Sequence, residues 1–242
     1  CDPGHYCPAG AVTPTPCPAH TFRNESGAEQ ESQCLPCPAG YTCSGATVSP
    51  VPCATGYYCL EGVSRTACPV GTYNNLTGAD SEMDCIECPA GYICEVKGTS
   101  SYELFSCIPD HYCPHGVDSP IACPAGTRYT GTGLGSEEGC TPCPGGFYCP
   151  GIGSDNRMRL IACDAGTYCP AGSTQESQCP AGSYCPAGTS DPVTCPGSYY
   201  CPAGSSDPIA CVASYYCPEG SSMQRQCPLG YQGNSQASID LD

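Results

Sequence analysis

Regularly spaced cysteines dominate one long segment of the chain. Between residues 163 and 227 they lie at positions 163, 169, 179, 185, 195, 201, 211, 217 and 227, so gaps of five and nine residues alternate and the pattern repeats every 16 residues. A fixed short period indicates an array of small structural units, each too small to bury a hydrophobic core by itself. The remainder of the chain varies the same unit.

Composition shows why the cysteines matter for folding. Leu, Ile, Val and Phe together supply only 28 of 242 residues, there is no Trp, and the formal net charge is −16. Such a composition would ordinarily leave a chain disordered. The 27 cysteines exceed the level that marks a disulfide scaffold. Because each disulfide contributes roughly 2–4 kcal/mol, we expect cross-links to replace the missing core.

A disulfide scaffold predicts a secreted or cell-surface protein, since disulfides persist in oxidising compartments. Two N-glycosylation sequons agree with this, at Asn24 and Asn75. No apolar run reaches 18 residues, so we expect no direct membrane insertion in this segment. With one Lys and six Arg, a nucleic-acid partner is not expected. The absence of an initiator Met and a signal-like run favours an internal piece of a longer protein.

Two kinds of unit alternate along the chain. A short unit, Cys-x5-Cys, occurs ten times, and a long unit with 16 residues between its cysteines occurs three times. Both sequons lie seven residues after the opening cysteine of a long unit, where the third long unit has Thr130. The predicted segments are 1–16 (short unit), 17–67 and 68–122 (each one long and two short units), 123–226 (one long and five short units) and 227–242 (start of a truncated long unit).

The fold class expected is that of small disulfide-rich repeats. We predict an elongated array of short β-hairpins, turns and irregular chain, with almost no helix and a minimal core, because no 3.6-residue apolar period occurs. The frequent Pro-Ala-Gly after an opening cysteine is turn chemistry. Tyrosines recur beside the second cysteine, and we expect them to stack as an apolar spine rather than to bind sugars or a partner.

Three disulfide pairings are compatible with the spacing. Adjacent short units could interlock, each unit could close on itself, or each unit could link to the next. Interlocking fails for the five short units between Cys140 and Cys227, an odd number. We favour closure within units, which leaves Cys227 unpaired and bridges the long-unit cysteines Cys17, Cys34, Cys68, Cys85, Cys123 and Cys140, and the short-unit cysteines Cys1, Cys7, Cys37, Cys43, Cys53, Cys59, Cys88, Cys94, Cys107, Cys113, Cys143, Cys149, Cys163, Cys169, Cys179, Cys185, Cys195, Cys201, Cys211 and Cys217.

The stretch CPVGTYNNLTGADSEMDCIECPAGYIC (68–94) resembles the ephrin-receptor-like and tumour-necrosis-factor-receptor-like cysteine-rich repeats, a growth-factor-receptor type of array. The resemblance extends over the whole chain through the Cys-Pro-x-Gly-x-Tyr start and the Cys-x-x-Cys junction. It implies a large extracellular protein. The five consecutive 16-residue units are more similar to surface proteins of protists and algae, including components of flagellar hairs (mastigonemes).

No catalytic, cofactor or metal site is expected. The Cys-x-x-Cys pairs, such as Cys34 and Cys37, belong to the periodic array, which favours disulfides over redox or zinc motifs. A metal site at Cys107, His111, Cys113 and His115 is not expected either, because His111 occupies the same place in its unit as His5, whose unit lacks the second histidine. Acidic residues late in the long units lack the alternating ligands of a calcium loop. No nucleophile–base set can be assembled, which predicts a non-enzymatic chain.

These inferences predict a structural segment that serves as a stalk, spacer or filament building block. Its expected partners are copies of itself or other chains of an extracellular assembly, together with N-linked glycans. The alternative is a receptor-type module that binds a protein ligand. For that role the best candidates are the two atypical connections at 95–106 and 150–162, the second of which carries Arg157 and Arg159.

Overall fold

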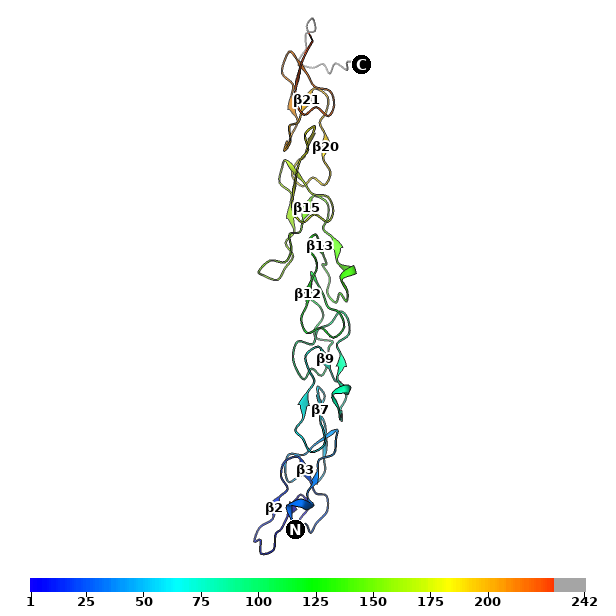
Figure 1. Ribbon diagram of the computed structural model, residues 1–242, viewed down its shortest axis with the longest axis vertical. Coiled ribbons are helices and arrows are strands. Elements are labelled where there is room, and N and C mark those ends of the chain that lie inside the picture. Colours follow the sequence, from blue (N-terminus) through cyan, green and yellow to red (C-terminus); the bar gives the residue numbers. More distant parts are fainter. Residues whose placement is uncertain (229–242) are drawn as a thin grey trace. The chain divides into compact units, whose positions relative to one another are not determined.

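A computed structural model describes residues 1–228 (Figure 1). Contacts divide the chain into two compact bodies. The first body comprises Cys1–Ile108, Tyr112–Ile121 and Thr132–Ser136, and the second comprises Pro109–His111, Ala122–Gly131 and the chain from Glu137 onward. The truncated long unit predicted at 227–242 lies outside the described residues except for its first two.

Short antiparallel hairpins make up the described chain, as the sequence predicted. Twelve two-stranded sheets form among residues 1–228, and every strand has two residues. Between Cys1 and Ala122 they are β1 (His5–Tyr6) with β2 (Thr15–Pro16), β3 (Thr21–Phe22) with β4 (Leu35–Pro36), β5 (Tyr41–Thr42) with β6 (Val51–Pro52), β7 (Tyr57–Tyr58) with β8 (Thr66–Ala67), β9 (Thr72–Tyr73) with β10 (Ile86–Glu87), and β11 (His111–Tyr112) with β12 (Ile121–Ala122).

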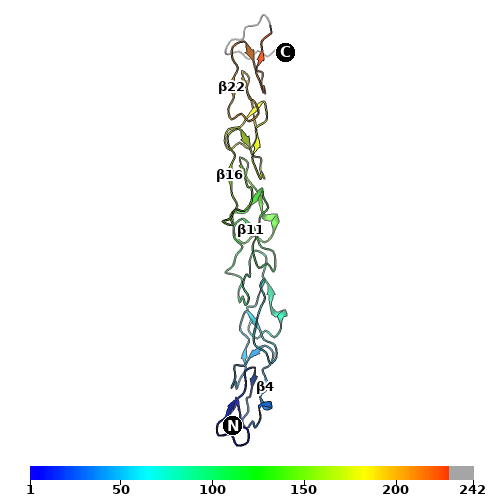
Figure 2. The ribbon, with the colours of Figure 1, turned by 60° about the vertical axis from the view of Figure 1, so that its left-hand side comes forward.

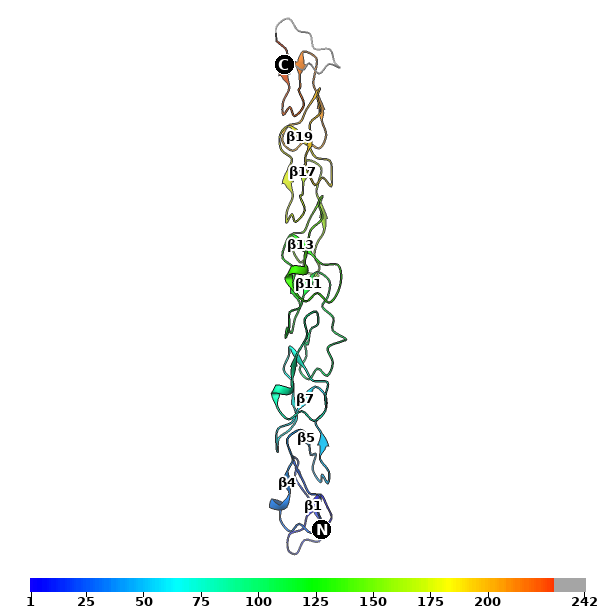
Figure 3. The ribbon, with the colours of Figure 1, turned by 90° about the vertical axis from the view of Figure 1, so that its right-hand side faces the viewer.

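The hairpins from Cys123 onward belong to the second body and follow one another in chain order (Figures 2 and 3). They are β13 (Thr127–Arg128) with β14 (Thr141–Pro142), β15 (Phe147–Tyr148) with β16 (Ile161–Ala162), β17 (Thr167–Tyr168) with β18 (Ser177–Gln178), β19 (Ser183–Tyr184) with β20 (Val193–Thr194), β21 (Tyr199–Tyr200) with β22 (Ile209–Ala210), and β23 (Tyr215–Tyr216) with β24 (Arg225–Gln226). The helical residues described are three short 3₁₀ turns, η1 (Glu31–Gln33), η2 (Glu82–Asp84) and η3 (Glu137–Gly139).

The turn after each opening cysteine sets up its hairpin. In the unit that begins at Cys179, Gly182 has a φ of +86°, which suits glycine because it has no Cβ. The Ser183 N–H donates to the Pro180 carbonyl at 3.2 Å and closes the turn. Strand β19 then pairs with β20, and the Cys195 N–H donates to the Gly182 carbonyl at 2.9 Å. The Pro-Ala-Gly pattern therefore acts as the reversal that the sequence indicated.

Each unit closes on itself through its own disulfide, which is the second of the three pairings considered. The long-unit bridges are Cys17–Cys34, Cys68–Cys85 and Cys123–Cys140. The short-unit bridges are Cys1–Cys7, Cys37–Cys43, Cys53–Cys59, Cys88–Cys94, Cys107–Cys113, Cys143–Cys149, Cys163–Cys169, Cys179–Cys185, Cys195–Cys201 and Cys211–Cys217. Among residues 1–228, Cys227 is the cysteine that remains free.

Cystine sulfur, and not tyrosine, fills the interior. Of the 25 buried apolar residues in the described chain, 21 are cysteines and none is a tyrosine. Ring contacts join Tyr102 to Tyr73 and Tyr92, with centroids 4.9 and 5.0 Å apart, as a local cluster. The expectation of a buried tyrosine spine was therefore wrong. The tyrosines of residues 1–228 are half-buried or exposed.

Neighbouring units are joined by three backbone hydrogen bonds, which the units starting at Cys163 and Cys179 illustrate. The Gly166 N–H donates to the Cys185 carbonyl at 2.8 Å. The Cys169 N–H donates to the Thr189 carbonyl, and the Gly188 N–H donates back to the Cys163 carbonyl, both at 2.9 Å. Equivalent bonds recur along the chain, so main-chain atoms join consecutive units.

The long units have the same backbone arrangement as the short ones. At the position that a second cysteine occupies in a short unit, the long units have Arg23, Asn74 and Tyr129. Their carbonyls accept hydrogen bonds from Gly4, Gly56 and Asp110 of the preceding unit at 2.7–2.8 Å, just as a cysteine carbonyl does elsewhere. The long unit is therefore a short unit whose opening cysteine has a more distant partner.

Glycine is required where a unit packs against the second unit along the chain. A Cβ on Gly182 would lie 2.5 Å from the Gly220 carbonyl oxygen, closer than real Cβ atoms approach. Gly166 and Gly204 repeat this contact in the second body, and Gly91 and Gly133 repeat it in the first. Because the obstacle is backbone, it cannot rotate away as a side chain could.

Alanine substitutions at Gly182 and Gly188 separate this packing constraint from backbone strain. Both glycines have positive φ, +86° and +76°, but a Cβ on Gly188 would meet nothing within 4 Å. Gly188→Ala should therefore cost about 1–2 kcal/mol of conformational strain. Gly182→Ala should lower the free energy of unfolding by roughly 1–3 kcal/mol more than Gly188→Ala does, because of the steric overlap. Denaturant unfolding of the oxidised protein measures the difference, and equal losses would contradict the packing contact.

Candidate functional site in the loops of the long units

Both predicted sequons lie on exposed loops at the same place in their units. Asn24 and Asn75 each follow the residue that replaces the second cysteine, and each lies on the surface with its sequon Ser26 or Thr77 also exposed. An oligosaccharyltransferase must reach both the asparagine and the hydroxyl residue, so this exposure is compatible with modification. N-glycosylation at the two sites stays a prediction.

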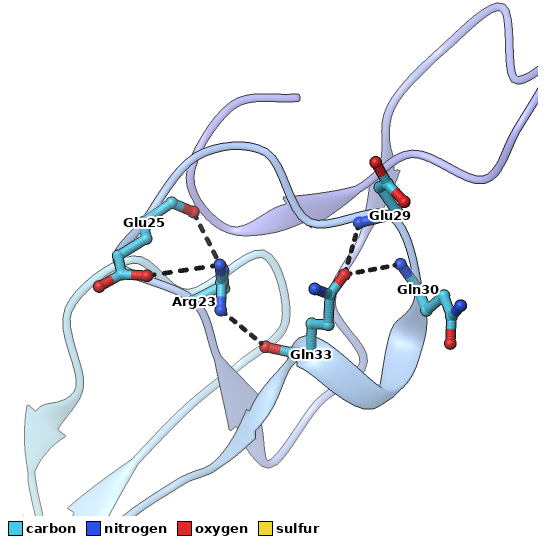
Figure 4. A network of polar contacts seen from close by, with 5 residues as sticks. All are labelled: Arg23, Glu25, Glu29, Gln30 and Gln33. Carbon is cyan, nitrogen blue, oxygen red and sulfur yellow. Dashed lines mark hydrogen bonds and ion pairs between the residues drawn. The ribbon is translucent and has the colours of Figure 1, made fainter.

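Arg23 holds the first of these loops (Figure 4). Its Nε donates to the Glu25 carbonyl and its Nη1 donates to the Gln33 carbonyl, both at 3.2 Å. Nη2 also forms an ion pair with the Glu25 carboxylate at 3.5 Å. The Arg23 side chain is 16 % exposed and that of Glu25 is 74 % exposed, so the guanidinium lies beneath the loop. A single side chain thus joins the two ends of the segment that carries Asn24.

Asn74 holds the corresponding loop of the second long unit. It is 1 % exposed, its Oδ1 accepts the Leu76 N–H at 3.0 Å, and its Nδ2 donates to the Tyr57 carbonyl at 3.2 Å. A buried amide must find such partners to offset its lost hydration. The residue before each sequon asparagine therefore fixes the middle residue of that sequon, Glu25 or Leu76. The loop geometry does not depend on the acceptor asparagine itself.

The acidic and amide residues at the end of these loops cap the 3₁₀ turns. Asp84 Oδ2 accepts the N–H groups of Asp80 and Ser81 at 2.9 and 3.1 Å. Gln33 Oε1 takes the same place in the first long unit and accepts the N–H groups of Glu29 and Gln30. Because a neutral amide substitutes for the carboxylate, the position requires an acceptor and not a charge. Nowhere in residues 1–228 do three or more His, Cys, Asp or Glu side chains gather as potential metal ligands.

The Cys-x-x-Cys pairs and the cysteine–histidine cluster have structural roles. Cys34 and Cys37 belong to different bridges, and so do the equivalent cysteines of the other two junctions. Cys107 is bonded to Cys113, so neither offers a thiolate. The buried His111 places its Nδ1 2.9 Å from the Pro109 carbonyl oxygen, as His5 does with Pro3 at 3.2 Å, while His115 is exposed.

The atypical connection at 150–162 projects from the second body as a small ordered loop (Figure 1). Ile152 bridges to Met158, and the Gly153 N–H donates to the Arg157 carbonyl at 2.9 Å. Asp110 anchors it, since its carboxylate accepts the N–H groups of Met158 and Tyr129, both at 3.3 Å. Met158 is buried, whereas Arg157 and Arg159 are exposed.

Comparison with models of protein families and with curated proteins finds no match for this chain. No helix in the described part has the length and apolar character needed to cross a bilayer. Its 13 disulfides are typical of proteins that fold in an oxidising compartment. The disulfide-rich array is thus compatible with an extracellular structural or binding module.

The role assigned to Asn74 predicts opposite outcomes for two adjacent asparagines. In protein made without N-glycosylation, Asn74→Ala should cost about 1–3 kcal/mol, because the Leu76 amide and the Tyr57 carbonyl lose their partner at a buried site. Asn75→Ala, at the exposed neighbouring residue, should change the free energy of unfolding by no more than about 0.5 kcal/mol. Hydrogen exchange at the Leu76 amide should accelerate in the first variant only. Equal losses of stability and equal exchange rates at the Leu76 amide in the two variants would show that Asn74 does not fix this loop.

Proposed function

We propose that this chain is a non-enzymatic structural segment of a secreted or cell-surface protein, which serves as a disulfide-stapled stalk, spacer or filament building block. The observation that carries the proposal is the recurrence of the same backbone hydrogen bonds between consecutive units. Units joined this way contact near neighbours only, so length can be added one unit at a time without a new core.

The chemistry of the units suits such a role. Most cysteines of the intra-unit disulfides are buried, the exposed Cys1 being an exception, so reductants have little access to most of the bonds that maintain the units. The inter-unit bonds use main-chain atoms, so surface residues can vary without loss of the array. We assign the chain to the ephrin-receptor-like type of cysteine-rich repeat on its Cys-Pro-x-Gly-x-Tyr pattern. Its proposed partners are copies of itself or other extracellular chains, and its proposed modification is N-linked glycosylation at Asn24 and Asn75.

The loop at 150–162 favours a second candidate, a receptor-type module that binds a protein ligand. This loop is anchored by Asp110 and Met158 and exposes two of the few cations of an acidic chain, Arg157 and Arg159. For this role, the Arg157→Ala/Arg159→Ala chain should fold normally and lose binding to its partner. A spacer should retain its assembly after the same change.

Deletion of whole units tests the spacer directly. Removal of residues 179–194 takes out one 16-residue unit together with its own Cys179–Cys185 bridge and leaves the other bridges intact. For a spacer, small-angle scattering should show a maximum dimension that falls by a fixed amount, and by twice that amount when 179–210 is removed. The reason is that each unit adds the same contacts in the same direction.

The matched control deletes 153–156 at the tip of the projecting loop, which restores the usual nine-residue connection. That change should leave the maximum dimension unchanged. A compact particle, with a bell-shaped distribution of interatomic distances that barely responds to unit deletion, would contradict the spacer function.

A further inference from the structure

The second long unit exposes three large apolar side chains beside its sequon. Leu76, Met83 and Ile86 are 66, 94 and 46 % exposed, although they lie within eleven residues of one another. Together with Thr77, Gly78 and Asp80 they border a shallow hollow of about 410 Å³. We refer to Leu76, Met83 and Ile86 as the apolar patch.

The patch is specific to this unit. The first long unit has the same backbone, but it has Glu25 and Ser32 in place of Leu76 and Met83, and only Leu35, in place of Ile86, is apolar. The third has Gly131 and Glu138 there, and Thr141 in place of Ile86. The residues that form the hairpin and the disulfide do not require apolar side chains at these positions. Since the buried interior is formed by cystines, the patch also does not contribute to a core.

The acceptor asparagine lies in the sequence between two residues that line the hollow. Asn74 and Leu76, which flank Asn75 in the sequence, both line it, and so does the sequon residue Thr77. Asn74 fixes this stretch through its bonds to Leu76 and Tyr57. A sugar attached to Asn75 is therefore tethered next to the patch, which raises its effective concentration there far above that of any free ligand.

We propose that the first N-acetylglucosamine residues of an N-linked glycan on Asn75 pack over the apolar patch. The proposal rests on the N-glycosylation proposed above. In that reaction the Asn75 Nδ2 displaces the pyrophosphate of a lipid-linked oligosaccharide; a C1–N bond forms, the C1–O bond breaks, and the amide gives up one proton. The acetyl methyl group and the C–H face of the sugar suit Leu76, Met83 and Ile86, while its hydroxyls face water and the exposed Asp80.

The Asn24 glycan provides an internal comparison, because its unit has polar residues in place of Leu76 and Met83 and retains one exposed apolar residue, Leu35, in place of Ile86. The full chain should be expressed in a secretory eukaryotic host, and mass spectrometry should establish occupancy at both sites. Under native conditions, peptide:N-glycosidase should release the Asn75 glycan about tenfold more slowly than the Asn24 glycan, the ratio expected for a modest packing free energy.

Met83→Ser should abolish most of that difference. Met83 is almost fully exposed, so the substitution should not disturb folding, and the serine is the residue of the first long unit. Met223→Ser, at another exposed methionine, is the matched control and should leave both release rates unchanged.

Each other outcome overturns the proposal in a distinguishable way. Equal rates of glycan release from Asn24 and Asn75, with both sites occupied, would show that the sugar does not contact the apolar patch, although glycosylation occurs. An unoccupied Asn75 beside an occupied Asn24 would remove its premise. Concentration-dependent self-association that Met83→Ser eliminates would assign the patch to a second copy of the chain.

Discussion

The disulfide inside each unit is the constraint on which the rest of the structure depends. With 28 Leu, Ile, Val and Phe residues in 242, the chain cannot bury enough hydrocarbon to offset the entropy of ordering its backbone. A bridge between cysteines six or 17 residues apart closes a small loop and reduces that entropy before folding. The buried sulfur then occupies the space that side chains fill in an ordinary domain. Each hairpin, with two residues per strand, would be too small to persist without it.

Once a unit is closed, main-chain geometry decides how the next one is placed. The donor and acceptor groups of the first turn and of both cysteine positions face the neighbouring unit, and their bonding does not depend on side chains. This explains how short and long units can alternate, since Arg23, Asn74 and Tyr129 each provide the carbonyl that a cysteine provides elsewhere. The residue that replaces the second cysteine in a long unit can take another structural role. Arg23 and Asn74 fix the start of the loops that carry the sequons, and the Cys17–Cys34 and Cys68–Cys85 bridges enclose these loops.

The sequence predicted the turns, the hairpins and the near absence of helix, because Pro-Ala-Gly and the cysteine period encode local geometry. It left three pairings open, since the linear spacing of residues such as Cys185 and Cys195 does not report distance in space. It was wrong about the tyrosines, whose regular spacing reflects the strand position and not burial. The hydrogen bonds by which Arg23 and Asn74 fix the sequon loops were not predicted from the sequence, although both residues occupy the position of the second cysteine in a short unit. The positive φ angles of Asp110 and Ser198 could not be predicted from the sequence either. Both are non-glycine residues in the left-handed region, where contacts with neighbouring units must hold them.

The proposed role is that of an extracellular spacer, in which disulfides close the units and repeated backbone hydrogen bonds join them. Its central claim is that every unit is closed by its own disulfide. Proteolysis of the non-reduced, alkylated protein followed by mass spectrometry of the linked peptides tests that claim most directly. The account predicts Cys179–Cys185 and Cys195–Cys201 as intra-unit bridges and Cys68–Cys85 across a long unit. Bridges such as Cys185–Cys195 or Cys85–Cys88, or a majority of alkylated thiols, would contradict it.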